Sequence, residues 1–410
     1  MNVIFLTICR IGDIQMRDIY TDLMRKFKQE GHSVWVVYPR ERRFNLPTEE
    51  YKQIGINMLG VKTLNIQKTN VVEKGVGTLL VENQFKRAIK KHFGNVNFDL
   101  ILYCTPPITF TNVIKYLKRK NPAAVSYLML KDIFPQNAVD IGMFGKNSIF
   151  NWYFRRKEVA LYNASDFIGC MSPANVEYLL KHNCFVNKDR VEVCANAVEL
   201  SAPDNTDNIE QDLKRKNEWL YIRKKYDLPT DLPIFIYGGN LGKPQGIDYL
   251  IKCLEAVKTR LDCYFIIVGN GTEYGKLENW YTENKIGCVK LMSRLPQEDY
   301  EMLVRSCDVG LIFLDHRFTI PNYPSRLLNY MEAKMPVICA TDVNSDIGSI
   351  AVENGYGFWC ESVNPNDFVA LVDKMLTADR TTMGERGYEF LKNNYLVEQN
   401  YQTIIRHLHV

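Results

Sequence analysis

The sequence lacks any long apolar run. None of its hydrophobic stretches approaches the roughly 18 residues that a membrane-spanning helix requires, and the mean hydropathy is −0.22. The N-terminus, Met1–Leu6, has no basic segment before its short apolar stretch, which favours a strand over a signal peptide. Internal repeats and low-complexity segments are absent as well. These absences predict a globular chain that is soluble, or at most peripheral to a membrane.

The sequence also lacks the cysteine and histidine patterns that hold metals. Its 11 cysteines stand about ten or more residues apart, with no Cys-x-x-Cys pair and no histidine at zinc spacing. No H-E-x-x-H or D-x-D string occurs, and no histidine has a clustered serine and carboxylate for a hydrolytic triad. An odd number of unpaired thiols favours a reducing compartment. We therefore expect a cytoplasmic protein without a metal site.

The net charge of +4 hides an asymmetry. The 410 residues include 51 Lys and Arg and 47 Asp and Glu, but residues 1–200 hold 28 basic and 18 acidic side chains and carry +10. Residues 201–410 carry −6. Such an asymmetry points to an anionic partner for the first half. No nucleic-acid-binding motif accompanies the charge, so no nucleic acid is expected.

Short β-branched runs alternate with helical segments along the chain, as in α/β units around parallel sheets. A polar, charged segment at 201–231, with a helix predicted at 208–226, divides this alternation. The pattern predicts two Rossmann-like, doubly wound α/β domains facing each other across a cleft. Their expected bounds are 1–205, completed by a C-terminal helix 395–410, and 206–394. Strands are predicted at 3–8, 34–37, 100–103, 124–128, 167–170, 234–237, 264–268, 289–292, 309–313 and 337–340.

A glycine-rich segment follows the strand predicted at 234–237. It reads Gly238-Gly239-Asn240-Leu241-Gly242-Lys243-Pro244-Gln245-Gly246 and leads into an amphipathic helix. Glycines between a strand and a helix let backbone N–H groups approach a phosphate, and the helix dipole favours negative charge. Lys243 adds a cation suited to a diphosphate, although the spacing is not that of a Walker loop. A tight turn without a ligand is the alternative interpretation.

Two further segments of the second half have similar features. Val268-Gly269-Asn270-Gly271 ends a predicted strand, at the sheet edge where a nucleotide would bind, although such turns are often structural. Ser325 and Arg326 stand at a predicted helix start and offer amides and a cation to an anion.

In their order and separation, these three segments resemble the nucleotide-sugar half of family 4 glycosyltransferases, which are retaining enzymes of the GT-B fold. The resemblance continues through Leu295-Pro296 and Asp308–Leu311, and in the first half through Gly31–Val34 and Asn196–Glu199. Within the family, the strings at 240–246 and 130–135 are similar to those of bacterial O-antigen and capsular polysaccharide transferases.

The resemblance implies a nucleotide-diphosphate sugar as co-substrate, no metal or other cofactor, and stabilisation of the leaving diphosphate by Lys243 and Arg326. The chain departs from the family at Pro321 and Asn329, where two glutamates are usual. It departs again at Asn240 and Gln245, where the usual arginine and lysine hold the diphosphate. The residues implied in nucleotide-sugar binding are Gly12, Gly239, Asn240, Gln245, Gly269, Gly271, Arg294, Tyr323, Ser325, Asn329 and Glu332.

Asp132 is the catalytic candidate of the first half. It follows the strand predicted at 124–128, where a carboxylate can orient an acceptor hydroxyl or take its proton. A helix N-cap or a turn is the alternative interpretation of this aspartate. The loop 7–13 is the other expected element of the site, in which Gly12 lets the backbone approach the sugar and phosphate.

Three basic segments of the first half combine cations with apolar residues: 78–93, 115–120 and 152–157. This combination suits anionic lipid headgroups or a polyprenyl diphosphate, while the solvated side of ordinary outer helices is the alternative. In the first segment a helix is predicted to place on opposite faces Val81, Phe85, Ala88, Ile89 and Phe93, and Lys86, Arg87, Lys90 and Lys91.

The sequence therefore predicts a retaining, metal-independent GT-B glycosyltransferase of the hexosyltransferase type, in bacterial surface polysaccharide biosynthesis. It is expected in the cytoplasm, peripheral on the inner face of the cell membrane, with a polyprenyl-diphosphate-linked or saccharide acceptor. The donor sugar, its base and the linkage are not identified. Two alternatives stay open: a non-catalytic nucleotide-sugar-binding partner, which the absent glutamates favour, and a nucleotide-sugar 2-epimerase, for which no convincing acid/base set is evident.

Overall fold

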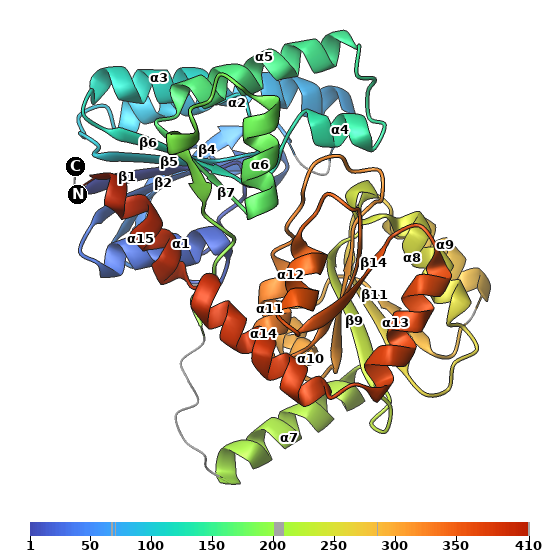
Figure 1. Cartoon of the computed structure of the whole chain (residues 1–410). Helices are drawn as coiled ribbons and strands as arrows, with labels where there is room; N and C mark the ends of the chain where they lie inside the picture. The colour runs from blue at the N-terminus through green and yellow to red at the C-terminus, as the bar shows by residue number, and fades with distance from the viewer. Residues whose placement is uncertain (67–68, 70, 201–208, 285, 409–410) are drawn as a thin grey trace. The chain divides into compact units, whose positions relative to one another are not determined.

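The chain divides into two compact units in the computed structural model, which describes residues 1–66, 69, 71–200, 209–284 and 286–408. Unit 1 comprises Met1–Glu199 and Leu396–Val410, and unit 2 comprises Leu200–Tyr395 (Figure 1). The boundary expected at 205/206 falls in 201–208, outside the described residues. Among the described residues, no helix combines the length and the apolar character needed to cross a membrane.

Unit 1 is built on an eight-stranded sheet in the order β3-β4-β2-β1-β5-β6-β7-β8, parallel except for β3. The hairpin of β3 and β4, which turns at Ile54 and Gly55 with positive φ values of 45° and 80°, was not predicted, and neither was β8. The strands are β1 (Asn2–Leu6), β2 (Ser33–Glu41), β3 (Glu49–Gln53), β4 (Ile56–Thr63), β5 (Leu100–Cys104), β6 (Val125–Leu130), β7 (Phe167–Cys170) and β8 (Val191–Val193).

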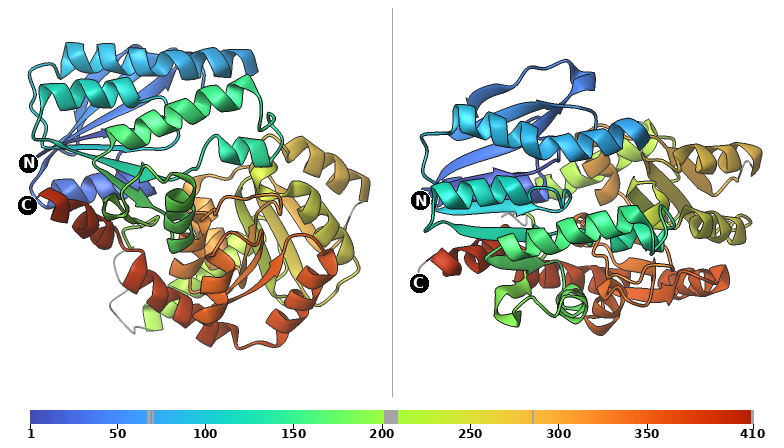
Figure 2. Two further views of the ribbon diagram at one scale, coloured as in Figure 1. Left: turned by 45° about the horizontal axis from the view of Figure 1, so that its top comes forward. Right: turned by 90° about the horizontal axis from the view of Figure 1, so that it is seen from above.

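Helices cover both faces of this sheet. On one face α2 packs against α3, and α3 packs against α5, so that the three lie side by side (Figure 2). On the other face α1 packs against α15, with the ring of Tyr401 edge-on to that of Phe27. The helices of unit 1 are α1 (Ile19–Gln29), α2 (Val71–His92), α3 (Thr111–Lys120), α4 (Gln136–Asp140), α5 (Ile149–Ala164), α6 (Pro173–His182) and α15 (Val397–Ile405).

The helix predicted at 78–93 is the C-terminal part of α2, and its two faces are those expected from the sequence. Val81, Phe85, Ile89 and Phe93 are buried, because this face lies on β4 and α3. The opposite face exposes its cations, apart from Lys86, which is half-buried beneath Tyr116.

Unit 2 is built on a six-stranded parallel sheet in the order β11-β10-β9-β12-β13-β14. All five strands predicted for this half are present, and the edge strand β14 was not predicted. The strands are β9 (Ile234–Asn240), β10 (Tyr264–Asn270), β11 (Val289–Met292), β12 (Val309–Phe313), β13 (Val337–Thr341) and β14 (Gly357–Glu361).

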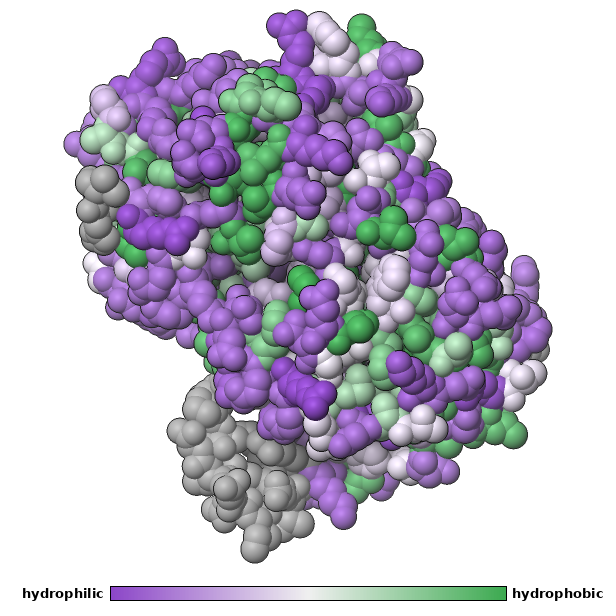
Figure 3. Space-filling model, viewed as in Figure 1, coloured by the Kyte–Doolittle hydropathy of each residue, from purple (hydrophilic) through white to green (hydrophobic). Residues whose placement is uncertain are grey.

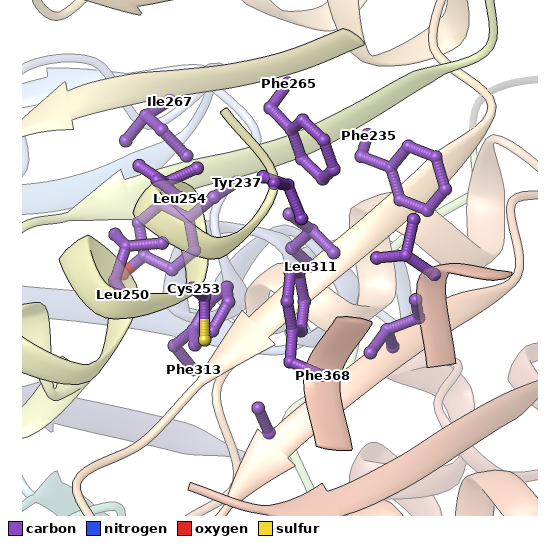
Figure 4. Close-up of a cluster of buried hydrophobic side chains, with 14 of the residues drawn as sticks. Phe235, Tyr237, Leu250, Cys253, Leu254, Phe265, Ile267, Leu311, Phe313 and Phe368 are labelled. Carbon is purple, nitrogen blue, oxygen red and sulfur yellow. The ribbon is translucent and has the colours of Figure 1, made fainter. Parts of the chain in front are cut away.

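Side chains from β9, β10 and β12 form the core of unit 2 with α8 and α13 (Figure 4). Phe313 is central to it, since its ring lies 5.4 Å from that of Phe368 and 6.1 Å from that of Tyr237. The helices of unit 2 are α7 (Ile209–Lys225), α8 (Ile247–Ala256), α9 (Tyr274–Asn284), α10 (Gln297–Arg305), α11 (Arg326–Glu332), α12 (Ile347–Glu353), α13 (Pro365–Thr377) and α14 (Arg380–Asn394).

The cysteines behave as small apolar side chains, as predicted. All are free thiols, and nine of the 11 are buried, while Cys9 is half-buried and Cys184 is exposed. Burial raises the pKa of Cys360 to about 11, so its thiol is protonated and unreactive at neutral pH.

Close packing of α14 on α11 depends on a glycine. A Cβ atom added at Gly384 would lie 1.8 Å from the backbone oxygen of Lys334, which cannot rotate away. We therefore expect Gly384→Ala to lower the free energy of unfolding by roughly 1–3 kcal/mol, because α14 and the turn that follows α11 must move apart. Urea-induced unfolding of the two proteins measures this difference.

Gly275 in α9 is the matched control, since nothing lies within 4 Å of its added Cβ. Alanine in a helix costs less backbone entropy than glycine, so Gly275→Ala is expected to be neutral or stabilising by up to about 1 kcal/mol. Equal stability of the Gly384→Ala variant and the wild type would contradict the close contact.

Candidate functional site

The carboxyl ends of β9 and β12 form a topological switch point in unit 2. From β9 the chain continues to β10 on one side, whereas β12 pairs with β9 on the other side. In open α/β sheets, ligands bind where the strand order reverses in this way. The glycine-rich segment 238–246 begins in the last three residues of β9, and the segment 314–326 follows β12. The two loops touch, because the Asp315 N–H donates to the Pro244 carbonyl at 3.0 Å.

The glycine-rich loop is closed by its own side chains. The Asn240 side-chain amide donates to Gln245 Oε1 at 3.0 Å, and the Gly242 N–H donates to the same oxygen at 3.2 Å. Asn240 and Gln245, both predicted to bind the nucleotide sugar, therefore fix the conformation of the loop. Lys243 is exposed in the short 3₁₀ turn between them, and Gly246, with a φ of 59°, begins α8.

The glycines after β10 serve close packing of the two strand ends. A Cβ at Gly269 would lie 1.8 Å from the Gly239 carbonyl oxygen, and one at Gly271 would lie 2.2 Å from that of Leu241. The Leu241 N–H also donates to the Asn270 carbonyl at 3.0 Å. Close packing of the strand ends therefore accounts for Gly269 and Gly271. Their contribution to nucleotide binding stays a prediction.

Arg326 is the central cation of this region. Its guanidinium carbon lies 4.2 Å above the ring of Tyr237 and 3.3 Å from where a Cβ of Gly239 would be. Nη1 is buried and has no hydrogen-bond partner. Within the part of the chain that the structure describes, no carboxylate forms an ion pair with this arginine. A buried guanidinium that lacks a counter-ion favours the binding of an anion.

Tyrosines surround this arginine, and the sequence did not single them out. Tyr330 accepts a hydrogen bond from the Gly238 N–H at 3.0 Å and donates one to the Ile236 carbonyl. A Cβ at Gly238 would collide with the ring of Tyr300. The only sequence signal was the spacing of Arg326 and Tyr330, four residues apart on one helix face. These rings hold the guanidinium in place without neutralising it.

Asp342 holds the loop that precedes Arg326. Its carboxylate accepts hydrogen bonds from the Asn344 and Ser345 N–H groups and from the Ser345 hydroxyl, and the hydroxyl oxygen of Ser345 accepts the Asn322 N–H. Burial raises the pKa of Asp342 to about 6, against the opposing effect of these bonds. Tyr323 also faces inward and pairs its hydroxyl with that of Tyr395. The predicted ligand Tyr323 therefore positions the loop.

Four predicted residues lie on or beside α11 and the loop after β11. Ser325 is exposed, and its side chain does not cap the helix. Asn329 is exposed on the same side of α11 as Arg326, since Leu327, Leu328, Tyr330 and Met331 are buried. Glu332 is half-buried one turn further on, and Arg294 is exposed.

Asp315 adds a negative charge at the switch point, and Arg317 balances it. The guanidinium donates to both carboxylate oxygens, at 2.8 and 2.7 Å. Burial alone would raise the pKa of Asp315, but the bonds from Arg317 hold this pKa below its usual value. Arg317 therefore neutralises Asp315 within the loop that follows β12.

Unit 1 has its own switch point, between β1 and β5. Gly12 lies in the loop after β1, is exposed, and has no atom within 4 Å of an added Cβ. Thr105, after β5, accepts hydrogen bonds from the Lys131 and Asp132 N–H groups and donates one to the Asp132 carbonyl. This threonine fixes the backbone that carries the candidate carboxylate.

Asp132 lies directly after β6 with its carboxylate largely enclosed. Burial raises its pKa to about 6, although hydrogen bonds from Asn137 and the Ile133 N–H oppose the shift. Its neighbour Lys131 turns away and donates to the carbonyls of Cys194 and Ala195. The N-cap of α4 is Pro135, so Asp132 is not a helix cap. A carboxyl group with a pKa near neutrality is suited to proton transfer.

The structure thus groups Gly239 and Arg326 directly, and ties Asn240, Gln245, Gly269 and Gly271 into the adjoining strand ends. Gly12 and Asp132 belong to unit 1. Among the described residues, no three His, Cys, Asp or Glu side chains converge as metal ligands. The absence of a metal cofactor stays a prediction.

Part of unit 2 is similar to a known protein family. Residues 221–390 match the family described as "Glycosyl transferases group 1". The match lies within the unit that carries Arg326 and the glycine-rich loop.

Two relatives extend the similarity. The chain is 23% identical over 280 residues to "Probable glycosyltransferase WbjE" of Pseudomonas aeruginosa, covering 65% of this chain and 64% of that protein. It is 23% identical over 132 residues to "Putative colanic acid biosynthesis glycosyl transferase WcaI" of Escherichia coli, covering 32% of this chain and 31% of the relative. The aligned regions thus span less than two thirds of these relatives.

A solved structure shows the fold of the whole chain. HepE of Anabaena, crystallised in complex with UDP and glucose, aligns with a TM-score of 0.69 and 14% identity, covering 100% of this chain and 99% of HepE. The two α/β units with parallel sheets are those of the GT-B fold, as the sequence predicted.

The enclosed carboxylate of Asp132 gives a testable dependence of stability on pH. Burial raises the pKa of Asp132 from 3.8 to about 6. Ionising this carboxyl therefore costs more free energy in the folded protein than in the unfolded chain, which lowers stability at higher pH. We expect Asp132→Asn to be more stable than the wild type at pH 8, by roughly 1–3 kcal/mol. The advantage should shrink as the pH falls through about 6 and vanish below about 4. Urea unfolding over a pH series measures it.

Asp189→Asn is the matched control, since this carboxylate of unit 1 is exposed. Its effect on stability is expected to be small at every pH. A difference between Asp132→Asn and the wild type that does not change with pH would contradict the raised pKa.

Proposed function

We propose that the protein is a retaining glycosyltransferase that moves a sugar from a nucleotide-diphosphate donor to a lipid-linked or saccharide acceptor. The single observation that carries this proposal is the buried Nη1 of Arg326, which has no partner at the switch point of a glycosyl transferases group 1 domain. HepE, which shares the fold, was crystallised with UDP and glucose. A nucleoside diphosphate supplies the anion that this arginine lacks.

The diphosphate is proposed to bind over Gly239. The missing side chain there leaves room beside the guanidinium, and a Cβ at this φ of 132° would be strained as well as close to Arg326. Lys243 supplies a second cation from the exposed turn, and the N-terminus of α8 favours negative charge in the same loop. These groups stabilise the charge that develops on the leaving diphosphate.

The contacts to the nucleoside and sugar are proposed to come from α11. Asn329 is exposed on the side of Arg326 and can hydrogen-bond a ribose hydroxyl. Glu332, one turn later, is proposed to take the role of the glutamates that Pro321 and Asn329 replace. Ser325 and Arg294 are exposed near the same sheet edge and complete the proposed set.

Asp132 is proposed to act on the acceptor. The bond between the anomeric carbon and the diphosphate oxygen breaks, and a bond from that carbon to the acceptor oxygen forms on the same face of the sugar. The acceptor proton goes to the departing diphosphate, and Asp132 orients the hydroxyl or relays that proton. A pKa of about 6 suits either role. No metal cofactor is proposed.

The acceptor is proposed to be a polyprenyl-diphosphate-linked saccharide at the inner face of the cell membrane. WcaI is named for colanic acid biosynthesis, which supports a role in surface polysaccharide assembly, as of O-antigen or capsule. The exposed cations of α2, Arg87, Lys90 and Lys91, would attract the anionic surface. A cytoplasmic location follows from this proposal.

A non-catalytic nucleotide-sugar-binding partner is the second candidate, because Pro321 and Asn329 take the place of carboxylates. Both candidates bind the donor, but only a transferase forms product with a lipid-linked acceptor. Incubating the donor alone tests the 2-epimerase as well, since that enzyme would isomerise the sugar without an acceptor.

Replacing Arg326 tests the donor site. Thermal shift with nucleoside diphosphates and nucleotide sugars identifies the ligand, since 100 times its Kd stabilises by about 2.7 kcal/mol. We expect Arg326→Met, which fills the same space without charge, to weaken that ligand roughly ten- to hundredfold, as expected for a lost charged hydrogen bond. Isothermal titration calorimetry measures the change. The double variant Lys243→Ala, Arg326→Ala should lose about a thousandfold in transfer rate.

Arg305→Ala is the control, because this exposed arginine ends α10 away from the loops. It should bind the nucleotide as the wild type does. Turnover of the double variant near that of the wild type would refute the assignment of the diphosphate site.

A further inference from the structure

Large apolar side chains are exposed together where α5 begins. The exposed fractions are 57% for Met143, 74% for Ile149, 61% for Phe150 and 57% for Trp152. We call residues 143–152 the α5 tip. Exposed hydrophobic residues of this size are ordinarily scattered singly, and a group within ten residues marks an interaction surface.

The backbone of the α5 tip is satisfied by its own polar groups. The Ser148 side chain accepts a hydrogen bond from the Asn151 N–H at 3.1 Å, and the Asn151 side chain donates to the Lys146 carbonyl at 2.6 Å. The Ser148 N–H donates to the Gly145 carbonyl. These bonds fix the turn before α5. The outward position of Ile149 and Phe150 is therefore determined by the fold of this segment.

The tip stands on a platform of three aromatic rings. Phe134 lies 4.9 Å from Phe154 and 6.1 Å from Phe144, both ring pairs being edge-on. Phe134 is two residues after Asp132, so the platform joins the tip to the segment that carries the candidate carboxylate. Whatever binds the tip is thereby placed near Asp132 within unit 1.

Cations flank the apolar side chains. Lys146 and Arg156 are exposed, and the Arg156 guanidinium lies 4.8 Å from the ring centroid of Trp152. Lys157 is half-buried with its ammonium 5.6 Å from the ring of Tyr153. The sequence from 141 to 157 contains no aspartate or glutamate. The surface is thus complementary to a negatively charged partner with an apolar interior.

Helix α2, which lies in the same layer beyond α3, repeats this combination. Val76, Leu79 and Leu80 are exposed on its first half, ahead of Arg87, Lys90 and Lys91 on its second half. In the view of Figure 3, hydrophobic residues lie among hydrophilic ones over the end of unit 1 where α5 begins in Figure 1.

We propose that the α5 tip inserts into the headgroup and acyl boundary of an anionic bilayer. Trp152, Phe150 and Ile149 enter the boundary, where tryptophan is enriched, and Lys146, Arg156 and Lys157 contact lipid phosphates. The inference rests on the proposed function, since a lipid-linked acceptor anchored in that bilayer is brought to Asp132. Four side chains offer far less than the roughly 800 Å² that each partner buries in a stable protein interface. This difference favours a membrane over a second protein.

Vesicle sedimentation tests the insertion. We expect the wild type to bind vesicles of phosphatidylcholine with phosphatidylglycerol and to bind phosphatidylcholine alone more weakly. The variant I149S/F150S/W152S should lose at least about tenfold in partition coefficient, since apolar insertion scales with the buried hydrocarbon. The matched control L261S/V352S/V363S removes three exposed apolar residues of unit 2 and should bind as the wild type.

Two further measurements define the contact. K146Q/R156Q/K157Q should weaken binding to the anionic vesicles and reduce its salt dependence. Brominated lipids should quench the tryptophan fluorescence of the wild type more than that of W152F. Unchanged binding of the triple serine variant, or equal quenching in W152F and the wild type, would overturn the proposal. So would a wild-type dimer in light scattering that this variant converts to a monomer.

Nucleotide binding separates this inference from the proposed function. The triple serine variant should retain the thermal shift with the nucleotide of the wild type, because the tip and the donor loops belong to different units. Vesicle binding without any nucleotide binding would refute the transferase and leave the membrane contact standing. Nucleotide binding with no vesicle binding by the wild type would refute only the insertion.

Discussion

Much of the geometry at the carboxyl ends of the unit 2 strands depends on one unpaired charge. The guanidinium of Arg326 is enclosed by tyrosine rings and backbone, and its buried Nη1 has no partner. A protein that keeps such a group buried gives up stability that an ion pair or an apolar side chain would restore. The glycines around it serve the same arrangement, because a side chain at Gly239 would meet the guanidinium and one at Gly238 would meet Tyr300. The strand ends, loops and aromatic rings together hold the guanidinium of Arg326 in a position to bind an anion.

The hydrogen bonds of the surrounding loops explain how this geometry is maintained. Loop 342–346 binds the segment before Arg326 through Ser345, and Asn344 donates to the Phe318 carbonyl. Asn240 and Gln245 close the glycine-rich turn on the other side. Several polar residues of the types that usually bind ligands therefore fix the conformation of the loops. Few side chains are left to touch the bound molecule. Rigid supports reduce the reorganisation needed when charge develops in a reaction.

The strands of both sheets were predictable wherever an apolar run is bounded by turn residues. Of the missed strands, β3, β8 and β14 lie at sheet edges. β3 reads Glu-Glu-Tyr-Lys-Gln and β14 is only partly buried, so neither carries a continuous apolar signal. The apolar run of β4, which lies next to β3, is interrupted by Asn57 and Gly60. Within the site, the glycine loop and Arg326 could be singled out from local patterns. Their contact joins residues far apart in the sequence and is set by strand order. The inward turn of Tyr323 toward Tyr395 depends on tertiary packing, which local sequence does not reveal.

The return of α15 to unit 1 has a consequence for the order of folding during synthesis. Unit 2 is a continuous stretch of chain, whereas unit 1 is interrupted by it and needs α15 to cover α1. Until Val397–Ile405 has left the ribosome, Phe27 lacks Tyr401, and the His32 ring lacks its hydrogen bond to the Tyr401 hydroxyl. Domains generally fold as units while the chain emerges. Here the half that is translated first is therefore completed last, and its exposed apolar face must be tolerated while the whole of unit 2 is made.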